Sequence, residues 1–340
     1  MKETGKQIYI DKCIKLLHYI YKGDYLEQKK MQLITRNRLA HLYKDKNKIT
    51  SNIDYDVIYV ADKYYTFGGL ADRLRGIISL FDFCITNNLR FGIYFDYPFK
   101  LNKYLIPNKI KWEVDTLNRN PKFTYPLLID TPSTLTNVFQ YQKKQLNKII
   151  QRKEKRQVHC YTNADLVLSP ERFSYLFNLL FKPSATLKKH IEDNIRSIGC
   201  EYISISFRFV QLLGDFEDCL KQTLPVEEQN ILIKKCIDAI YKIHSIENKK
   251  RILITADSQK FLNQIKNIEF VYIIPGTIGH LNYSMDENTH LKTFIDFMMI
   301  SSAQKVYLAR TNKMFKSGFA RKAAMISNIP FEEYIIDENG

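Results

Sequence analysis

The pattern of apolar and polar positions predicts alternating strands and helices along most of the chain. Short apolar runs rich in β-branched residues at 56–61 and 90–95 predict buried parallel strands. Between them, residues 70–88 carry apolar side chains at helical spacing and follow the pair Gly68 and Gly69. This order predicts a strand–helix–strand unit.

The second half alternates more regularly than the first. Its predicted strands are 202–208, 251–256, 270–274, 306–309 and 334–336, and its predicted helices are 225–244, 258–267, 288–303 and 317–328. Strict alternation with short connections predicts a doubly wound parallel sheet, so the fold class is α/β.

The rest of the chain is less regular. Residues 7–45 are basic and have helical spacing, which predicts an N-terminal helical extension. A strand is expected at 157–161, and a helical stretch at 169–198 is broken by Pro183. We therefore expect an extension at 1–50, an N-terminal Rossmann-like domain at 51–198 and a C-terminal one at 199–340. Because ligands of open α/β sheets bind at the carboxyl ends of the strands, both halves should present loops to a shared central cleft.

Composition narrows the possible classes of protein. The chain has 340 residues, of which 45% are apolar, and this excludes a disordered chain. Its net charge of +15 suits nucleic acid, an anionic membrane surface or a phosphate-bearing small molecule. There is no apolar run of about 18 residues, so no transmembrane helix is predicted.

Cysteine and histidine spacing indicates neither a disulfide framework nor a metal site. Six cysteines are scattered without zinc-binding spacing, and the N-terminal residues lack the apolar core of a signal peptide. These features predict reduced thiols in a cytoplasmic protein. The histidines show no metal-binding spacing either, so no metal is expected.

The first candidate motif is Gly68 and Gly69 followed by Arg73 and Arg75. Glycines allow a ligand to approach the backbone closely, and the helix start that follows suits an anion. An ordinary strand–helix turn with solvated arginines explains the same residues.

The second motif is Arg208, at the end of a strand, with Asp215 and Glu217 in the loop that follows. An arginine there can bind a diphosphate through two hydrogen bonds and neutralise its charge. Either carboxylate could act as a general base. The alternative is a structural ion pair between Arg208 and Asp215.

Two further motifs lie in the second half. Asp257 follows a strand, where it can accept hydrogen bonds from a base or ribose, or cap the helix that begins near Ser258. Ser317 and Gly318 open another helix, as an ordinary start or as a diphosphate cradle. Asp296 lies on the preceding helix, either on an exposed face or at the mouth of a nucleotide site.

Taken in order, these motifs resemble those of the fucosyltransferase superfamily. The matching segments, spread over about residues 56–330, are GGLADRLRGIISL, SISFRF, ITADSQKFL and FIDFMMISSAQKVYLARTNKMFKSGFARKAAMI. The superfamily includes α1,6-fucosyltransferases, nodulation fucosyltransferases and protein O-fucosyltransferases. The resemblance implies an enzyme, a metal-independent and inverting glycosyltransferase with the GT-B fold.

The resemblance also implies a role for each motif. Arg208 would bind the donor diphosphate, Asp257 the guanosine side, and Ser317, Gly318 and Phe319 the β-phosphate; Asp296 would lie near the base, Gly68, Gly69 and Arg73 would line the cleft from the N-terminal half, and Asp215 or Glu217 would act as base. Two positions depart from the family pattern, because Ser206 stands where the family has His and Asp72 where it has Asn.

The resemblance makes GDP-fucose the leading donor substrate, with no separate cofactor. The expected acceptor is a hydroxyl of a bacterial cell-surface glycan or lipid-linked precursor. The excess positive charge at 7–48 and 143–156 suggests peripheral contact with an anionic membrane. Two alternatives stay open: transfer from another nucleotide sugar, and a basic nucleic-acid-binding protein, although no nucleic-acid motif is present.

Overall fold

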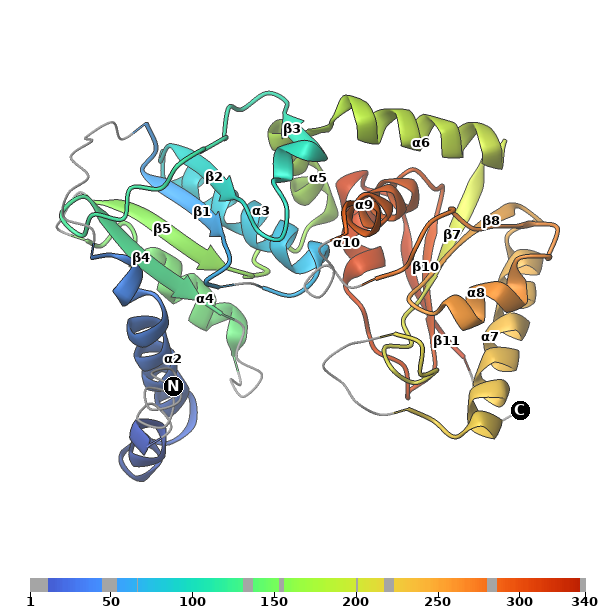
Figure 1. The fold of residues 1–340 in the computed structure, drawn as a ribbon, viewed down its shortest axis with the longest axis horizontal. Coiled ribbons are helices and arrows are strands. Elements are labelled where there is room, and N and C mark those ends of the chain that lie inside the picture. Colours follow the sequence, from blue (N-terminus) through green and yellow to red (C-terminus); the bar gives the residue numbers. More distant parts are fainter. Residues whose placement is uncertain are drawn as a thin grey trace. The chain divides into compact units, whose positions relative to one another are not determined.

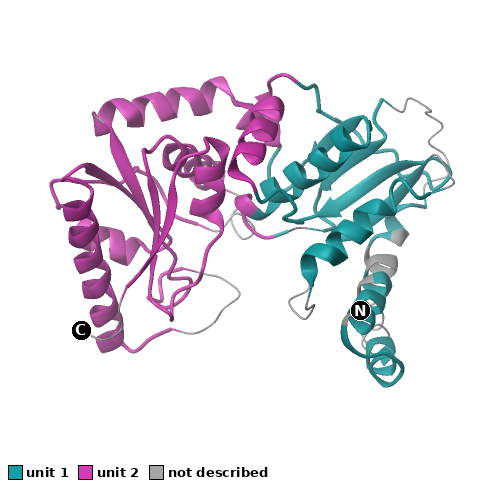
Figure 2. Cartoon of the chain, turned by 180° about the vertical axis from the view of Figure 1, so that it is seen from behind, with its two compact units in different colours: residues 1–67, 72–100, 110–168 teal, residues 68–71, 101–109, 169–340 magenta. Residues whose placement is uncertain are grey.

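The computed structural model describes residues 12–44, 54–65, 67–130, 137–152, 156–199, 201–216, 223–279 and 286–336. The chain forms two compact units (Figure 2). Unit 1 comprises residues 1–67, 72–100 and 110–168, and unit 2 comprises residues 68–71, 101–109 and 169–340. Each unit is built around its own parallel sheet.

The sheet of unit 1 has the strand order β2-β1-β5-β4 (Figure 1). All of its pairings are parallel. Its strands are β1 (Val57–Ala61), β2 (Phe91–Phe95), β4 (Thr124–Ile129) and β5 (Gln157–Thr162). The helices of the unit are α3 (Leu70–Thr86), whose first two residues belong to unit 2, α4 (Val138–Asn147), α2 (Gly23–Arg38) and the short η1 (Ala40–Leu42).

The N-terminal segment contributes to the core of unit 1. Residues 12–20 and 23–38 are helical, as the spacing predicts, while residues 7–11 of the expected extension lie outside the described residues. Leu39 is completely buried in a cluster with Ile58 and Val60 of β1. The end of the extension therefore covers one face of the sheet.

Close packing of α3 on the sheet depends on Gly76. A Cβ atom built at this position would lie 2.2 Å from the carbonyl oxygen of Thr162, at the end of β5. That contact is with backbone, which cannot move away as a flexible side chain could. Within the motif that opens α3, Gly76 is thus required by the fold, whereas a Cβ at Gly69 would meet no atom within 4 Å.

A buried chain of polar side chains lies on the same face of this sheet that the end of the extension covers. His159 of β5 is completely buried, with Nδ1 2.9 Å from the Tyr43 hydroxyl and Nε2 2.9 Å from Gln157 Oε1. Because Gln157 Nε2 donates to the Tyr55 carbonyl, its Oε1 is the atom that accepts from Nε2–H of histidine. Nδ1 then accepts from Tyr43, which fits a neutral imidazole, and burial lowers the pKa of His159 to about 3.

The sheet of unit 2 has the order β11-β10-β7-β8-β9 and is entirely parallel. Its strands are β7 (Tyr202–Phe207), β8 (Arg251–Ala256), β9 (Val271–Tyr272), β10 (Val306–Arg310) and β11 (Phe331–Ile335). Its main helices are α7 (Val226–Ile246), α8 (Gln259–Ile265), α9 (Glu287–Ser301) and α10 (Phe319–Ile326). Figure 1 shows α7 and α8 on one face of the sheet and α9 and α10 on the other.

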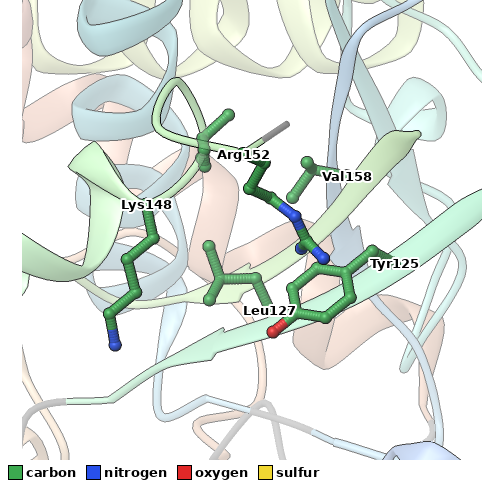
Figure 3. Close-up of a pocket in the computed structure, with 6 residues that line it drawn as sticks. Tyr125, Leu127, Lys148, Arg152 and Val158 are labelled. Atoms are coloured by element: carbon green, nitrogen blue, oxygen red, sulfur yellow. The ribbon is translucent and has the colours of Figure 1, made fainter. Parts of the chain in front are cut away.

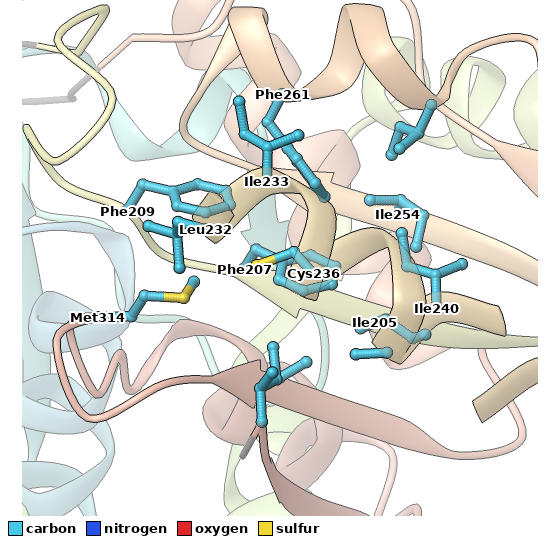
Figure 4. Close-up of a cluster of buried hydrophobic side chains, with 14 of the residues drawn as sticks. Ile205, Phe207, Phe209, Leu232, Ile233, Cys236, Ile240, Ile254, Phe261 and Met314 are labelled. Atoms are coloured by element: carbon cyan, nitrogen blue, oxygen red, sulfur yellow. The ribbon is translucent and has the colours of Figure 1, made fainter. Parts of the chain in front are cut away.

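The core between the sheet and α7 follows the alternation of β7. Ile203, Ile205 and Phe207 point to the face that packs against Cys236 and Ile240 of α7 (Figure 4). The opposite face of β7 carries Tyr202 and the serines of the strand. All six residues of the strand are buried, so the small serines are accommodated on its second face.

The segment 169–198 belongs to unit 2. It contains α5 (Pro170–Leu180) and α6 (Ala185–Ile198), separated by the short strand β6 (Phe181–Pro183), which pairs antiparallel with β3 (Leu105–Pro107) after η2 (Leu101–Lys103). The Ser174 hydroxyl of α5 donates to the Ile326 carbonyl of α10 over 2.9 Å. These contacts place the division between the units at 168, rather than at the expected 198, because α5 packs on helices of the second sheet.

Replacing Gly76 with alanine should destabilise the protein by about 1–3 kcal/mol, the usual cost of overpacking against backbone that cannot relax. Gly69→Ala is the matched control and should change the free energy of unfolding by less than about 0.5 kcal/mol. Denaturant titration measures both values. Equal stability of the two variants would refute the proposed close contact of α3 with β5.

The stability of unit 1 should fall in acid because His159 is buried in its neutral form. The unfolded chain takes up a proton on this histidine below about pH 6.5, and the folded chain does so only near pH 3. Between these values the free energy of unfolding should fall by about 1.4 kcal/mol per pH unit as the pH drops. His159→Gln should reduce this slope, whereas substitution of the exposed His41 by Gln should leave it unchanged. Equal slopes in all three proteins would contradict the assignment.

Candidate functional site

Three parallel strands of unit 2 bring their carboxyl ends to one edge. Phe207 of β7 pairs with Ala256 of β8, so the next residues, Arg208 and Asp257, are neighbours. Strand β10 runs parallel to β7 on its other side, and the segment that follows it leads to α10. In sheets of this kind, ligands bind at this edge.

Three polar contacts hold the side chain of Asp257 at this edge of the sheet. Its carboxylate accepts hydrogen bonds from the backbone N–H groups of Phe209 (2.7 Å) and Val210 (2.8 Å) and pairs with the Arg208 guanidinium (3.1 Å). The side chain is 5% exposed. Burial raises the pKa of Asp257, against the opposing effects of Arg208 and the two amides. Asp257 therefore has a structural function within the turn after β7, and its contact with the guanosine side of a donor stays a prediction.

The backbone of this turn is strained. Val210 has φ of 57°, in the left-handed region that β-branched residues avoid. Such a conformation costs on the order of 1–3 kcal/mol and persists only where surrounding contacts enforce it. The hydrogen bond from its N–H to the buried Asp257 carboxylate is one such contact.

Arg208 is held by its side chain and by its backbone. Its guanidinium lies 4.7 Å from the centre of the Phe216 ring, and the side chain remains 22% exposed. Its carbonyl accepts a hydrogen bond from the Phe315 N–H over 3.2 Å. This bond ties the turn after β7 to the loop that carries Ser317 and Gly318.

The loop after β10 ends in an open helix start. The Ser317 hydroxyl accepts from the N–H of Phe319, the first residue of α10 (3.2 Å). Gly318 is the N-cap and makes no side-chain cap, and a Cβ built there would meet no atom within 4 Å. Its φ of −80° is open to any residue, so the fold itself does not require glycine here. The free space and the positive end of the helix dipole suit an anion.

Of the two candidate bases, Asp215 lies in the described part of the chain. Asp215 is exposed, and its Oδ2 accepts from the Ser258 hydroxyl (2.9 Å) and the Lys260 N–H (2.7 Å), which ties it to the start of α8. The alternative ion pair of Arg208 with Asp215 is not formed, since the partner of Arg208 is Asp257. Glu217 lies outside the described residues.

The other predicted residues are engaged elsewhere. Asp296 of α9 pairs with Lys292 one turn earlier, through contacts of 2.5 and 2.6 Å. Arg73 is completely buried in unit 1, donates to the Tyr97 carbonyl over 2.7 Å and lies over the Phe95 ring. Arg73 is thus part of the interior, contrary to its expected place on a cleft surface. Gly68 precedes α3 with Gly69.

A second polar cluster, which the sequence did not predict, lies at the carboxyl ends of the strands in the sheet of unit 1. Asp62 directly follows β1, is 4% exposed, and accepts from Arg119 (2.7 Å) and the Tyr161 hydroxyl (3.1 Å). An acidic residue directly after an apolar strand was a signal that could have pointed to it. Arg119 gave none, because it lies in a segment without regular structure.

Comparison with known proteins identifies the fold. No protein-family model and no curated protein matches the sequence. Among solved structures, the fucosyltransferase NodZ from Bradyrhizobium superposes with a TM-score of 0.54 and 14% identity, over 82% of this chain and 96% of NodZ. A variant of FUT1 from Arabidopsis thaliana in complex with GDP gives 0.54 and 13%, over 94% of this chain and 81% of FUT1.

The chain has the fold of the GT-B fucosyltransferases. This confirms the expected α/β class and the GT-B architecture. On the fucosyltransferase fold, Arg208, Ser317 and Gly318 lie together at one sheet edge, whereas Arg73 and Asp296 are bonded within their own surroundings. Within the described ranges, no three His, Cys, Asp or Glu side chains are grouped to hold a metal ion, and no helix is long and apolar enough to span a membrane.

Asp257→Ala should destabilise unit 2 by about 3 kcal/mol or more, because it leaves Arg208 and two backbone N–H groups without their buried partner. Asp238→Ala, at an exposed position of α7, is the control and should cost less than about 0.5 kcal/mol. Chemical denaturation measures both. A small effect of Asp257→Ala would show that the turn does not depend on this carboxylate.

Proposed function

We propose that this chain is a glycosyltransferase that transfers fucose from GDP-fucose to a hydroxyl group of a glycan. The observation that carries the proposal is Arg208, fixed by the buried Asp257 and joined through its carbonyl to the open start of α10. The fold supports the choice of donor, since NodZ soaked with GDP-fucose superposes with a TM-score of 0.53 at 13% identity, over 82% of this chain and 94% of NodZ.

The edge of unit 2 suits a diphosphate. Arg208 offers planar N–H donors that match phosphate oxygens, and its pairing with Asp257 restricts its rotamers before any ligand arrives. The first N–H groups of α10 and the Ser317 hydroxyl would bind the β-phosphate. Glycine at 318 allows a phosphate to approach the backbone where a side chain would intervene.

The proposed reaction is a single displacement at the anomeric carbon of fucose. The acceptor hydroxyl oxygen forms a bond to this carbon while the bond to the β-phosphate oxygen breaks, and its electron pair leaves with GDP. The configuration inverts in one such step. Arg208 and α10 stabilise the negative charge that develops on the leaving diphosphate, with no metal ion required by the proposal.

A base must take the proton of the acceptor hydroxyl. Asp215 is the described candidate, because both of its hydrogen bonds to α8 involve Oδ2, and Oδ1 has no partner among the described residues. Those two bonds would orient the carboxylate. Glu217 remains the second candidate.

The proposed acceptor belongs to a bacterial surface glycan or a lipid-linked precursor. The helical segment 12–20 supports a peripheral contact with an anionic membrane, since Leu16, Tyr19 and Ile20 are exposed along one stripe and Lys12 and Lys15 lie beside them. The proposed location is the cytoplasm, including the inner membrane surface.

Ser206, which stands where the fucosyltransferase pattern has histidine, does not change the arrangement at this edge of the sheet. Its hydroxyl lies 2.7 Å from that of Thr255 in the neighbouring strand, and the side chain is buried. The serine is therefore satisfied inside the sheet. Another nucleotide sugar on the same fold, and nucleic-acid binding, remain the alternatives that the following experiment separates.

A thermal-shift panel of GDP, GDP-fucose, UDP, UDP-glucose and a short RNA tests the donor. Ligand at 100 times its dissociation constant adds about 2.7 kcal/mol of stability, so GDP and GDP-fucose should raise the melting temperature by several degrees. Arg208→Gln should abolish the shift, whereas Lys313→Gln, which removes an exposed charge from the loop after β10, should retain it.

Three outcomes would overturn the proposal. Stabilisation by uridine nucleotides alone would assign another donor, and stabilisation by RNA alone would favour nucleic-acid binding. A full GDP shift in folded Arg208→Gln would show that Arg208 does not bind the donor.

Transfer itself is tested by mass detection of a fucosylated product, with the wild-type protein, GDP-fucose and a mixture of glycan acceptors.

A further inference from the structure

Unit 1 contains a pocket that the proposed reaction does not use. It has a volume of about 240 Å³ and lies at the amino ends of β4 and β5, next to the segment that follows α4 (Figure 3). Its lining residues are Tyr125, Leu127, Lys148, Ile149, Arg152 and Val158. The opposite, carboxyl end of these strands is the edge where ligands of such sheets ordinarily bind, so this pocket is a separate feature.

The strand register builds an apolar floor. Tyr125 pairs with Val158 across β4 and β5, and Leu127 lies two residues further along β4. Parallel partners and residues two apart share a face, so all three side chains point to the side of the sheet that α4 covers. Leu127 and Val158 are buried, and β4 is one of the two edge strands of the sheet.

Two cationic side chains, Lys148 and Arg152, line the pocket. The Arg152 guanidinium lies 3.2 Å from the centre of the Tyr125 ring. Figure 3 shows the two side chains next to each other. Stacking on an aromatic face leaves the in-plane N–H groups of an arginine directed outward. Lys148, the C-cap of α4, supplies the second charge, and its Nζ donates to Gln145.

None of the described residues that line the pocket is acidic. Burial lowers the pKa of Lys148, and the nearby positive charges of Lys144 and Lys29 lower it further. A bound anion would favour the charged form of Lys148 and so oppose these effects. The geometry and the charge thus point to the same kind of ligand.

The size of the pocket restricts that ligand. Pockets for drug-sized molecules span roughly 300–1,000 Å³, and 240 Å³ lies below this range. The space suits one anionic group with a short apolar portion and is too small for a whole nucleotide sugar. The aromatic ring and aliphatic floor favour an attached hydrocarbon over a further polar group.

We propose that the pocket of Tyr125, Lys148 and Arg152 binds a phosphate group attached to an apolar chain. The phosphate would accept hydrogen bonds from Arg152 and Lys148, and the first carbons of the chain would pack on Leu127 and Val158. A phosphorylated amphiphile and free phosphate share the anionic chemistry, and the apolar floor distinguishes them.

Calorimetric titration of the full chain with hexyl phosphate, inorganic phosphate and hexyl glucoside separates these ligands. Hexyl phosphate should bind with one site per chain and at least tenfold more tightly than either other probe. Equal binding of inorganic phosphate would overturn the assignment to an amphiphile. Equal binding of hexyl glucoside would overturn the anionic requirement, and failure of all three to bind would refute the site.

Charge-removing variants test the residues. Arg152→Gln and Lys148→Met should each weaken hexyl phosphate at least tenfold, while Lys143→Met, at an exposed position on α4, should change the affinity less than twofold. Should one variant fail to fold, the other decides. Unchanged affinity in a folded variant, or an equal loss in Lys143→Met, would contradict the proposal.

Binding of hexyl phosphate to this pocket should not depend on the proposed transferase activity. The GDP-induced thermal shift should be the same in Arg152→Gln as in the wild-type protein, because Arg152 belongs to unit 1 and the diphosphate edge to unit 2. Loss of both binding events in this variant would indicate general damage to the protein and would count against a separate pocket.

Discussion

The candidate site depends on one buried carboxylate. Asp257 exchanges water for two backbone N–H groups and the Arg208 guanidinium, which offset part of the cost of burying it. The same bonds hold Val210 in a left-handed conformation that it would otherwise avoid. The position of Arg208 is therefore a consequence of burying Asp257. Through its carbonyl, Arg208 in turn holds the loop that leads to α10.

Two glycines that look alike in the sequence differ in physical meaning. Gly76 is required by the protein interior, because a Cβ would strike the backbone of β5. Gly318 is required by nothing among the described atoms, and a Cβ there would enter open space. A residue whose small size has no internal explanation, placed at a helix start beside a fixed arginine, is what a site for a phosphate group needs.

Much of the fold could be predicted from the sequence, because strands such as β1, β2, β8 and β10 are short and mostly apolar runs. The region 96–160 was harder. Strand β4 contains Pro126, which an edge strand tolerates, and α4 is so polar that its basic residues obscured the helical spacing. The break at Pro183 was foreseen, but its pairing with β3 rests on contacts distant in sequence.

The candidate site could be located by sequence, whereas the function of each residue could not. Asp257 and Arg208 both follow strands, and the pattern alone does not say that they pair with each other. Arg73 lies on a helix with other charged residues, and its complete burial depends on Tyr97 and Phe95. Burial and pairing are properties of the packed chain, so single-residue patterns cannot supply them.

The most direct test of this account is the calorimetric affinity for GDP of the wild-type protein and of Gly318→Ala. The account predicts one GDP per wild-type chain, an affinity at least tenfold weaker in Gly318→Ala, and the same thermal stability for the two free proteins, since the added Cβ meets no atom of the fold. Equal affinity of the two proteins for GDP, or no GDP binding by the wild-type chain, would contradict it.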